Sequence, residues 1–345
     1  MVAAQAQQKG DPTPSNPGDF GAAKVLARIQ PTASIRSLNP GIELTFQAMG
    51  TMCRILAAGR EPEVKRFFAE AIAWVAAFES KYSRFLPESL ISRINQAAGQ
   101  DWLATDSETD RILAMCHEMH FLTRGAFDPT SLPLIRLWNW KQSVPRIPAG
   151  EEVAAARELV GWSRLERRPG QIRLPKPGMC LDLGGMGKEY AVDQVSAMGV
   201  QRGLTGLLVD FGADVRVAGL PPDGRLGWHI GLEDPTQPGT CWTGLAVQNA
   251  GVATSGDYVR KFESGGKRYG HIVDVRTGYP VDNDVRAVSV MAPSCTLAGM
   301  LSTAAFVLGP QEGLKLIDTQ LSAAGALITG RGRLYSRRFQ QFVTT

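Results

Sequence analysis

The feature that most limits the fold of this chain is a change in sequence pattern near Arg173. Before this residue, apolar side chains spaced three and four apart predict a long amphipathic helix at 61–84, and a second helix is expected at 105–123. After it, short β-branched runs alternate with glycine turns, which is typical of strands. Three later helices are expected at 188–198, 298–308 and 310–318. The alternation predicts an α+β fold with a mainly antiparallel sheet and flanking helices.

The first expected strand covers 41–58 and is interrupted by Gly50. Further strands are expected at 172–174, 179–183, 207–211, 215–218, 228–232, 244–247, 252–255, 271–273 and 287–291. Residues 1–40 are rich in Gln, Pro, Ser, Gly and Ala and have no periodicity. We therefore expect a flexible segment over 1–40 and one folded domain over 41–345.

The composition argues against several classes of protein. The net charge of +4 is too small to indicate nucleic-acid binding. No apolar run reaches the roughly 18 residues that a membrane-spanning helix needs. The five cysteines do not have metal-ligand spacing, so we expect buried free thiols and no zinc site.

Six glycine-marked segments carry side chains that are unusual for simple loops. Met49 beside Gly50 can lay its thioether on a flat ring, or it can be a core residue at a β-bulge. Tyr82 can stack on a base or a flavin, or it can be a core aromatic. Asp128 before Pro129 can accept from a sugar hydroxyl or an adenine amine, or it can form an Asx turn.

The fourth segment runs from an expected strand through three glycines into a helix, between Asp182 and Lys188. Backbone N–H groups and a lysine at a helix N-terminus suit a phosphate. The segment matches neither the dinucleotide fingerprint nor the Walker pattern. Asp182 at the strand end can also meet a ring N–H.

Hydroxyls and a histidine mark the last two segments. Thr254 and Ser255 precede Gly256, and such hydroxyls suit phosphate oxygens. His271 follows a glycine and is either a structural histidine or a general base. Ser302 and Thr303 lie in an apolar helix, where they bond back to its carbonyls or ligate a hard cation.

In this order and at these spacings, the segments resemble one family, the ApbE-type FAD:protein FMN transferases. The matching stretches lie at 49–51, 82–85 with Ser89 and Asn95, 125–130, 182–188 with Asp193, 254–258, 271–280 and 303–309. They span about 43–318, which is most of the chain.

The resemblance implies an α+β fold with FAD in a cleft between two lobes. It implies a metal-assisted transfer of FMN from FAD onto a Ser or Thr hydroxyl of an acceptor protein, with release of AMP. His271 would be the base for that hydroxyl, and Mg²⁺ at the pyrophosphate would be held by Gly185, Ser302 and Thr303. The residues expected to contact FAD are Met49, Tyr82, Ala126, Phe127, Asp128, Asp182, Lys188, Thr254, Ser255, Gly256, Asp257, His271 and Ile272.

The resemblance also implies a place of action and a partner. Members of the family act mostly outside the cytoplasm on respiratory flavoproteins. We therefore expect a periplasmic or otherwise exported protein whose acceptor is a respiratory membrane flavoprotein, and no nucleic-acid partner. The small residues around Gln5 in Ala4-Gln5-Ala6 resemble a signal-cleavage site, while the composition of this stretch fits an ordinary flexible cytosolic tail equally well.

Two positions depart from the family pattern. Gly299 stands where the family has a metal-binding Asp, and Glu189 stands where it commonly has Gly. Because phosphoryl transfer depends on electrostatic stabilisation by the cation, a working transferase would need Asp257 or another acid, or phosphate and water ligands, to complete the metal site. Two alternatives to a transferase stay open. One is an FAD-binding protein with lost or weak catalysis, a carrier, sensor or electron-transfer partner in which Gly299→Asp rescues turnover. The other is an FAD pyrophosphatase.

Overall fold

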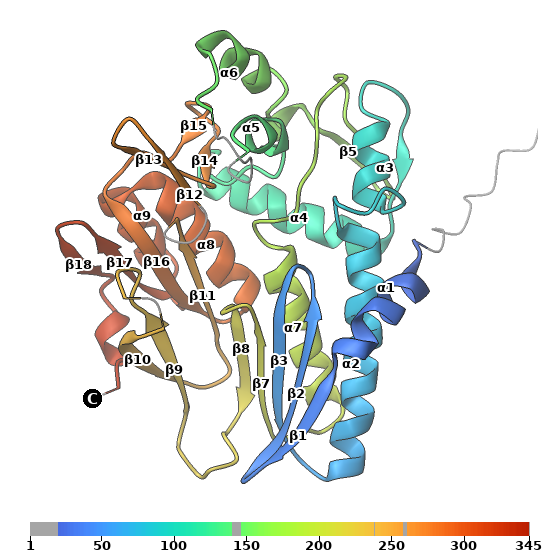
Figure 1. Cartoon of the computed structure of the whole chain (residues 1–345), viewed down its shortest axis with the longest axis vertical. Helices are drawn as coiled ribbons and strands as arrows, with labels where there is room; N and C mark the ends of the chain where they lie inside the picture. The colour runs from blue at the N-terminus through green and yellow to red at the C-terminus, as the bar shows by residue number, and fades with distance from the viewer. Residues whose placement is uncertain (1–19, 140–145, 238, 258–260, 345) are drawn as a thin grey trace, which may run out of the picture.

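The structure is a computed structural model that describes residues 20–139, 146–237, 239–257 and 261–344 (Figure 1). Its frame is a nine-stranded sheet in the order β1-β2-β3-β7-β8-β11-β16-β17-β18, with every neighbouring pair antiparallel. In that order the strands are Ser34–Leu38, Gly41–Ala48, Thr51–Ala58, Gly206–Phe211, Val215–Gly219, Gly251–Gly256, Val285–Ala292, Ala324–Thr329 and Gly332–Tyr335. The expected strand at 41–58 is a hairpin of two strands, β2 and β3.

The central strands of the sheet are buried on both faces, and the side chains of each strand alternate between two cores. On β7, Leu207 and Val209 belong to the main core on the helical side of the sheet. Leu208, between them, belongs to a second core with Val217 and Trp228. That second core lies under the ribbon of β9 (Trp228–Glu233) and β10 (Cys241–Val247).

Three expected helices pack on the main core, and the first of them does so with the apolar face that its 3.6-residue period predicts. They are α2 (Glu61–Tyr82), α7 (Gly187–Gln201) and α8 (Cys295–Leu308), and α7 contacts both of the others. Figure 1 shows α7 and α8 behind the sheet and α2 along its edge. The carboxylate of Asp193 on α7 accepts from the backbone N–H groups of Cys295 and Thr296, each at 2.8 Å, and so fixes the start of α8.

The remaining elements cover one end of the sheet and its edges (Figure 1). The helices are α3 (Leu90–Gln96), α4 (Ser107–Leu122), α5 (Leu132–Leu137), α6 (Gly150–Arg157) and α9 (Pro310–Thr319). The short strands are β4 (Leu103–Ala104), β5 (Glu166–Arg168), β6 (Gln171–Arg173), β12 (Lys261–Ser264), β13 (Lys267–Gly270), β14 (Val273–Asp274) and β15 (Tyr279–Pro280). A small core that includes Leu134, Trp138 and Phe262 joins α5 and α6 to the β12–β13 hairpin.

The expected domain boundary at residue 40 is too late. Residues 20–40 include the helix α1 (Ala22–Ile29) and the edge strand β1. Val25 and Ile29 are buried in the main core, and α1 contacts α2. These apolar contacts outweigh the Pro- and Ser-rich composition that predicted flexibility. The rest of the expected flexible segment, 1–19, lies outside the described residues.

The strand expected at 179–183 is a loop. The Asn95 side-chain amide donates to the carbonyl of Leu181 at 2.9 Å and accepts from its N–H at 2.6 Å. The N–H of Asp182 donates to the carbonyl of Pro129 at 2.8 Å. These partners satisfy the backbone that a neighbouring strand would otherwise pair. The strand expected at 271–273 likewise begins only at Val273.

All five cysteines are free thiols, and only Cys241 is exposed. Among the helices that the structure describes, none is long and apolar enough to cross a membrane.

Candidate functional site

The glycine segment at 184–187 is a tight turn that leads into α7. The N–H groups of Met186 and Gly187 both donate to the carbonyl of Leu183, at 3.0 and 2.7 Å. The N–H of Gly184 donates to Oδ1 of Asp182 at 3.0 Å. The turn therefore presents the first turn of α7 beside the Asp182 carboxylate, as the sequence predicts for this segment.

Asp182 joins this turn to the end of α2. Its Oδ2 pairs with Nε of Arg84 at 3.0 Å, two residues beyond the helix. Burial raises the pKa of Asp182, and the charge of Arg84 partly opposes that rise. The 82–85 and 182–188 segments are thus in direct contact.

Phe127 and Asp128 pack the third segment against the same turn. A Cβ on Gly185 would lie 3.3 Å from the Phe127 ring, so the glycine leaves room for the aromatic edge. Oδ1 of Asp128 accepts from the N–H and the hydroxyl of Thr130, at 2.8 and 2.6 Å, and Oδ2 accepts from the N–H of Trp162 at 3.1 Å. Oδ1 of Asp128 therefore forms an Asx turn, and Oδ2 ties that turn to the backbone of Trp162. Ala126, the third residue of this segment, is buried beside Phe127.

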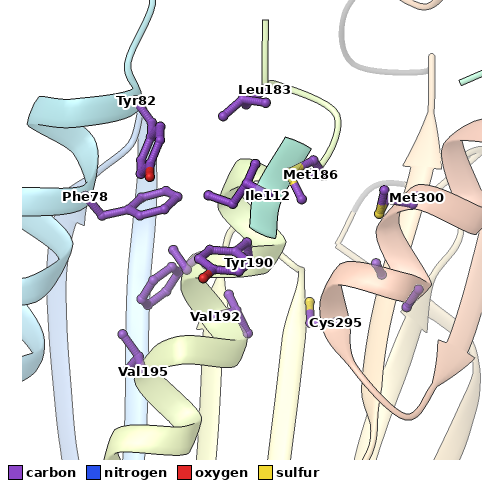
Figure 2. Packing of buried hydrophobic residues seen from close by; sticks show 14 of the residues in the cluster. Phe78, Tyr82, Ile112, Leu183, Met186, Tyr190, Val192, Val195, Cys295 and Met300 are labelled. Carbon is purple, nitrogen blue, oxygen red and sulfur yellow. The ribbon is translucent and has the colours of Figure 1, made fainter. Parts of the chain in front are cut away.

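Tyr82 lies inside the main core and has only 6% of its surface exposed. Figure 2 shows it among Phe78 and Tyr190, and its ring centroid lies 4.7 Å from that of Phe78. Its hydroxyl is bonded to Thr109 at 2.9 Å and to Glu108 at 3.1 Å. This is the packing of a core aromatic, the second of the two interpretations that the sequence allows.

The tip of the β2–β3 hairpin has positive φ at both Met49 (52°) and Gly50 (72°), as a type I′ turn requires. The Met49 N–H donates to Oε2 of Glu79 at 3.0 Å. A Cβ on Gly212, which has φ of 64°, would lie 2.2 Å from Oγ1 of Thr51. Gly212 therefore lets the hairpin tip approach the turn between β7 and β8.

Lys188 ties that turn to α7. Its Nζ donates to the carbonyl of Phe211 at 2.8 Å and forms an ion pair with Asp214. Although burial opposes it, the charges of Asp214 and Glu189 hold the pKa of Lys188 above its ordinary value. The ammonium is thus already paired where a phosphate was expected.

Three hydroxyls meet between β11 and α8. Oγ of Ser255 lies 2.8 Å from Oγ of Ser302 and 3.0 Å from Oγ1 of Thr303. Ser302 also donates to the carbonyl of Gly299 at 3.0 Å, the back-bonding expected of a serine in a helix. Thr254 on the same strand bonds to Ser289 of β16 at 2.8 Å. The 254–257 and 299–303 segments are therefore adjacent.

Asp257 and His271 flank the β12–β13 hairpin, one before it and one after it in the chain. Asp257 is 1% exposed and pairs with Nε of Arg268 at 2.8 Å. Burial raises its pKa to about 6, opposed by the charge of Arg286. His271 is half-buried and follows β13, and the carbonyl of Ile272 accepts from Val281 at 2.9 Å. Gly256 ends β11, and Tyr258, from the same segment, lies outside the described residues.

Glu189 departs from the family pattern in the sequence, but its contact with Gly299 is visible only in the structure. It is 8% exposed in the first turn of α7, and a Cβ on Gly299 would lie 2.6 Å from its Cγ and 3.0 Å from its Cδ and Oε1. Burial and the charge of Asp214 raise the pKa of Glu189 to about 8, opposed by Lys188. Within the described part of the chain, its Oε2 is buried without a hydrogen-bond partner. The only signal in the sequence is that an acid is gained at 189 and lost at 299.

The described residues contain no cluster of three or more His, Cys, Asp or Glu side chains that could bind a metal by themselves. Mg²⁺ needs less, because it is usually held by one or two carboxylates, waters and substrate phosphates. Glu189 abuts Gly299, and the Thr303 hydroxyl lies one helical turn beyond Gly299 on α8, so two hard oxygen donors border the same stretch of α8. A buried carboxylate oxygen without a partner fits a cation better than it fits a closed core.

The chain belongs to the ApbE family, whose model matches residues 49–328. It is 31% identical over 239 residues to a protein of Vibrio cholerae named FAD:protein FMN transferase, covering 68% of this chain and 71% of that one. A protein of the same name from Escherichia coli K12 is 26% identical, covering 88% of this chain and 89% of that one.

Solved structures share the fold. The flavin transferase ApbE from Vibrio cholerae superposes with a TM-score of 0.79 at 27% identity, covering 90% of this chain and 99% of that one. The ApbE protein from Thermotoga maritima gives 0.81 at 29% identity, covering 89% and 100%. The expected α+β fold with a large antiparallel sheet is therefore confirmed, and the roles of individual site residues remain predictions.

Proposed function

We propose that this chain is an FAD:protein FMN transferase. The observation that carries the proposal is the chain of contacts that joins segments far apart in sequence. Thr51 lies against Gly212, and the carbonyl of the preceding residue, Phe211, accepts from Lys188. Glu189, the residue after Lys188, contacts Gly299. One helical turn later, Thr303 contacts Ser255. Relatives that cover most of the chain are named for this activity.

The proposed reaction moves one phosphoryl group. The acceptor's Ser or Thr oxygen bonds to the FMN phosphorus of FAD, the phosphoanhydride bond breaks, and AMP leaves with the bridging oxygen. His271 is the proposed base that takes the hydroxyl proton. The chain's part is mainly to position both reactants, since phosphoryl transfer relies on alignment and electrostatic stabilisation.

The residues present fit a divalent cation, as the partnerless Oε2 of Glu189 indicates. We propose Mg²⁺, held by the Thr303 hydroxyl and by the backbone carbonyls at Gly185 and Ser302. When bound, the ion neutralises charge that develops on the phosphate oxygens. Lys188, already paired with Asp214, contributes a fixed positive charge beside α7.

We propose an exported protein that acts on a respiratory membrane flavoprotein. The basis is the family resemblance together with the small residues around Gln5.

The test is incubation of the chain with FAD, Mg²⁺ and an acceptor domain of a respiratory flavoprotein. We expect the acceptor to gain the mass of one FMN residue and AMP to appear in equal amount. Free FMN without an acceptor would indicate a pyrophosphatase. FAD that stays intact while bound would indicate a flavin-binding protein without catalysis.

A further inference from the structure

Glu189 is a buried carboxyl group whose Oε2 has no hydrogen-bond partner among the described residues. Burying a carboxylate is costly unless each oxygen has a partner. Neighbouring Lys188 does not provide one, because its ammonium is committed to Asp214 and the Phe211 carbonyl. Asp214, itself 5% exposed, adds a second negative charge close to Glu189. Asp214 thus neutralises Lys188, which leaves no cation of the described chain to pair with Glu189.

The position of the Glu189 carboxylate is set by Gly299. Its Cδ and Oε1 lie 3.0 Å from the place that a Cβ of residue 299 would take. The carboxyl carbon of an aspartate lies one C–C bond, about 1.5 Å, beyond its Cβ. An aspartate at 299 and the glutamate at 189 would therefore compete for the same volume. Glu189 reaches this volume from α7, and a side chain at 299 would reach it from α8.

The hydroxyl of Thr303 lies on the same side of α8 as this volume. Residues 299 and 303 are one turn apart, and helical side chains lean toward the preceding turn. Thr303 is already drawn to this side by Ser255, at 3.0 Å. Glu189, Thr303 and the carbonyls near the glycine turn therefore supply hard oxygen ligands, which suit Mg²⁺ or Mn²⁺.

We propose that Glu189 supplies from α7 the carboxylate that binds the divalent cation, in place of a residue at position 299. The inference rests on the proposed function for its biological meaning. The acid gained at 189 and the one lost at 299 are thus a single relocation of the ligand between two packed helices. Gly299 is therefore compatible with a cation site that is still present.

The experiment measures Mn²⁺ binding to the FAD-loaded full chain by calorimetry and by electron paramagnetic resonance. Glu189→Gln keeps the shape of the side chain and removes its charge. We expect it to weaken Mn²⁺ binding by about tenfold or more, since even partners outside the ligand shell cost that much. The double variant Glu189→Gly with Gly299→Asp moves the carboxylate to α8 and should recover affinity to within a few-fold of the original chain.

The matched control is Glu43→Gln. Glu43 is also buried, but its oxygens pair with Arg36 and Arg54 of the neighbouring strands β1 and β3. Its substitution should leave Mn²⁺ affinity unchanged, and thermal melting of every variant identifies loss of folding. Unchanged Mn²⁺ affinity in Glu189→Gln, or no Mn²⁺ binding by the original chain, would overturn the inference.

The outcome can be separated from that of the proposed function. If Mn²⁺ binding depends on Glu189 but no FMN reaches an acceptor, the ligand assignment stands and the transferase proposal fails. If FMN transfer proceeds and Glu189→Gln binds Mn²⁺ normally, the transferase proposal stands and the ligand assignment fails.

Discussion

The side chain of Glu189 fills the space beside Gly299 so closely that a Cβ at position 299 would lie 2.6 Å from its Cγ. The contact joins the first turn of α7 to the middle of α8, at residues far apart in the sequence. Glycine at 299 is therefore a condition for glutamate at 189. The contact also changes what a substitution at 299 is expected to do.

Gly299→Asp alone should not raise activity, contrary to what the sequence departure suggested. The new side chain would meet the Glu189 carboxylate, and two buried acids would repel each other. We expect a loss of stability of about 1–3 kcal/mol, typical of overpacking, measured by chemical denaturation. Combining it with Glu189→Gly should recover most of the loss. A single variant as stable as the original chain and more active would contradict the packing.

The stability of the metal-free chain should depend on pH through Glu189. Its folded pKa of about 8 lies above its ordinary value of 4.5, so its favourable contribution is complete below about pH 4.5 and is lost as pH rises through 8. In EDTA, Glu189→Gln should therefore match the original chain near pH 5. It should exceed it near pH 9 by on the order of a few kcal/mol, since one pKa unit is about 1.4 kcal/mol. A difference that does not change with pH would refute this.

Gly212→Ala should separate the β2–β3 hairpin tip from the β7–β8 turn. The added methyl group would lie 2.2 Å from Oγ1 of Thr51, at a backbone φ of 64°. Gly203→Ala is the matched control, because Gly203 has a similar φ of 78° and open space around it. We expect Gly203→Ala to cost about 1 kcal/mol and Gly212→Ala about 1–3 kcal/mol more. Equal denaturation midpoints would show that the contact is unimportant.

His271→Gln should slow FMN transfer by roughly 10²- to 10⁴-fold, the usual contribution of a general base. FAD affinity, followed by quenching of flavin fluorescence, should change much less. His229→Gln is the control, since His229 is exposed on β9 outside the site segments. Transfer at the original rate in the His271 variant would exclude this histidine as the base.

Periodicity predicted the elements that depend on packing alone. The helices α2, α7 and α8 and most strands of the large sheet lie close to their expected positions because their apolar spacing matches their burial. The apolar segment at 179–183 did not form the expected strand, because Asn95 satisfies the backbone of Leu181. Such a side-chain partner lies too far away in sequence for any local pattern to reveal it.

The sequence predicted which segments belong to the candidate site, but it did not predict how those segments contact one another. The resemblance identified Asp182, Ser255 and Thr303, and the structure places each in contact with another segment. It did not reveal that Glu189 lies against Gly299, because one sequence contains no information on pairs that touch across two helices. Both departures were visible, and only the packing shows that they occur at one place.

The most direct test is a crystal structure of the chain with FAD and Mn²⁺, with an anomalous difference map at the manganese edge. The account predicts FAD bound along the connected segments, with a manganese peak in contact with the Glu189 carboxylate, the Thr303 hydroxyl and the pyrophosphate. FAD bound elsewhere, or a manganese peak away from Glu189, would contradict it.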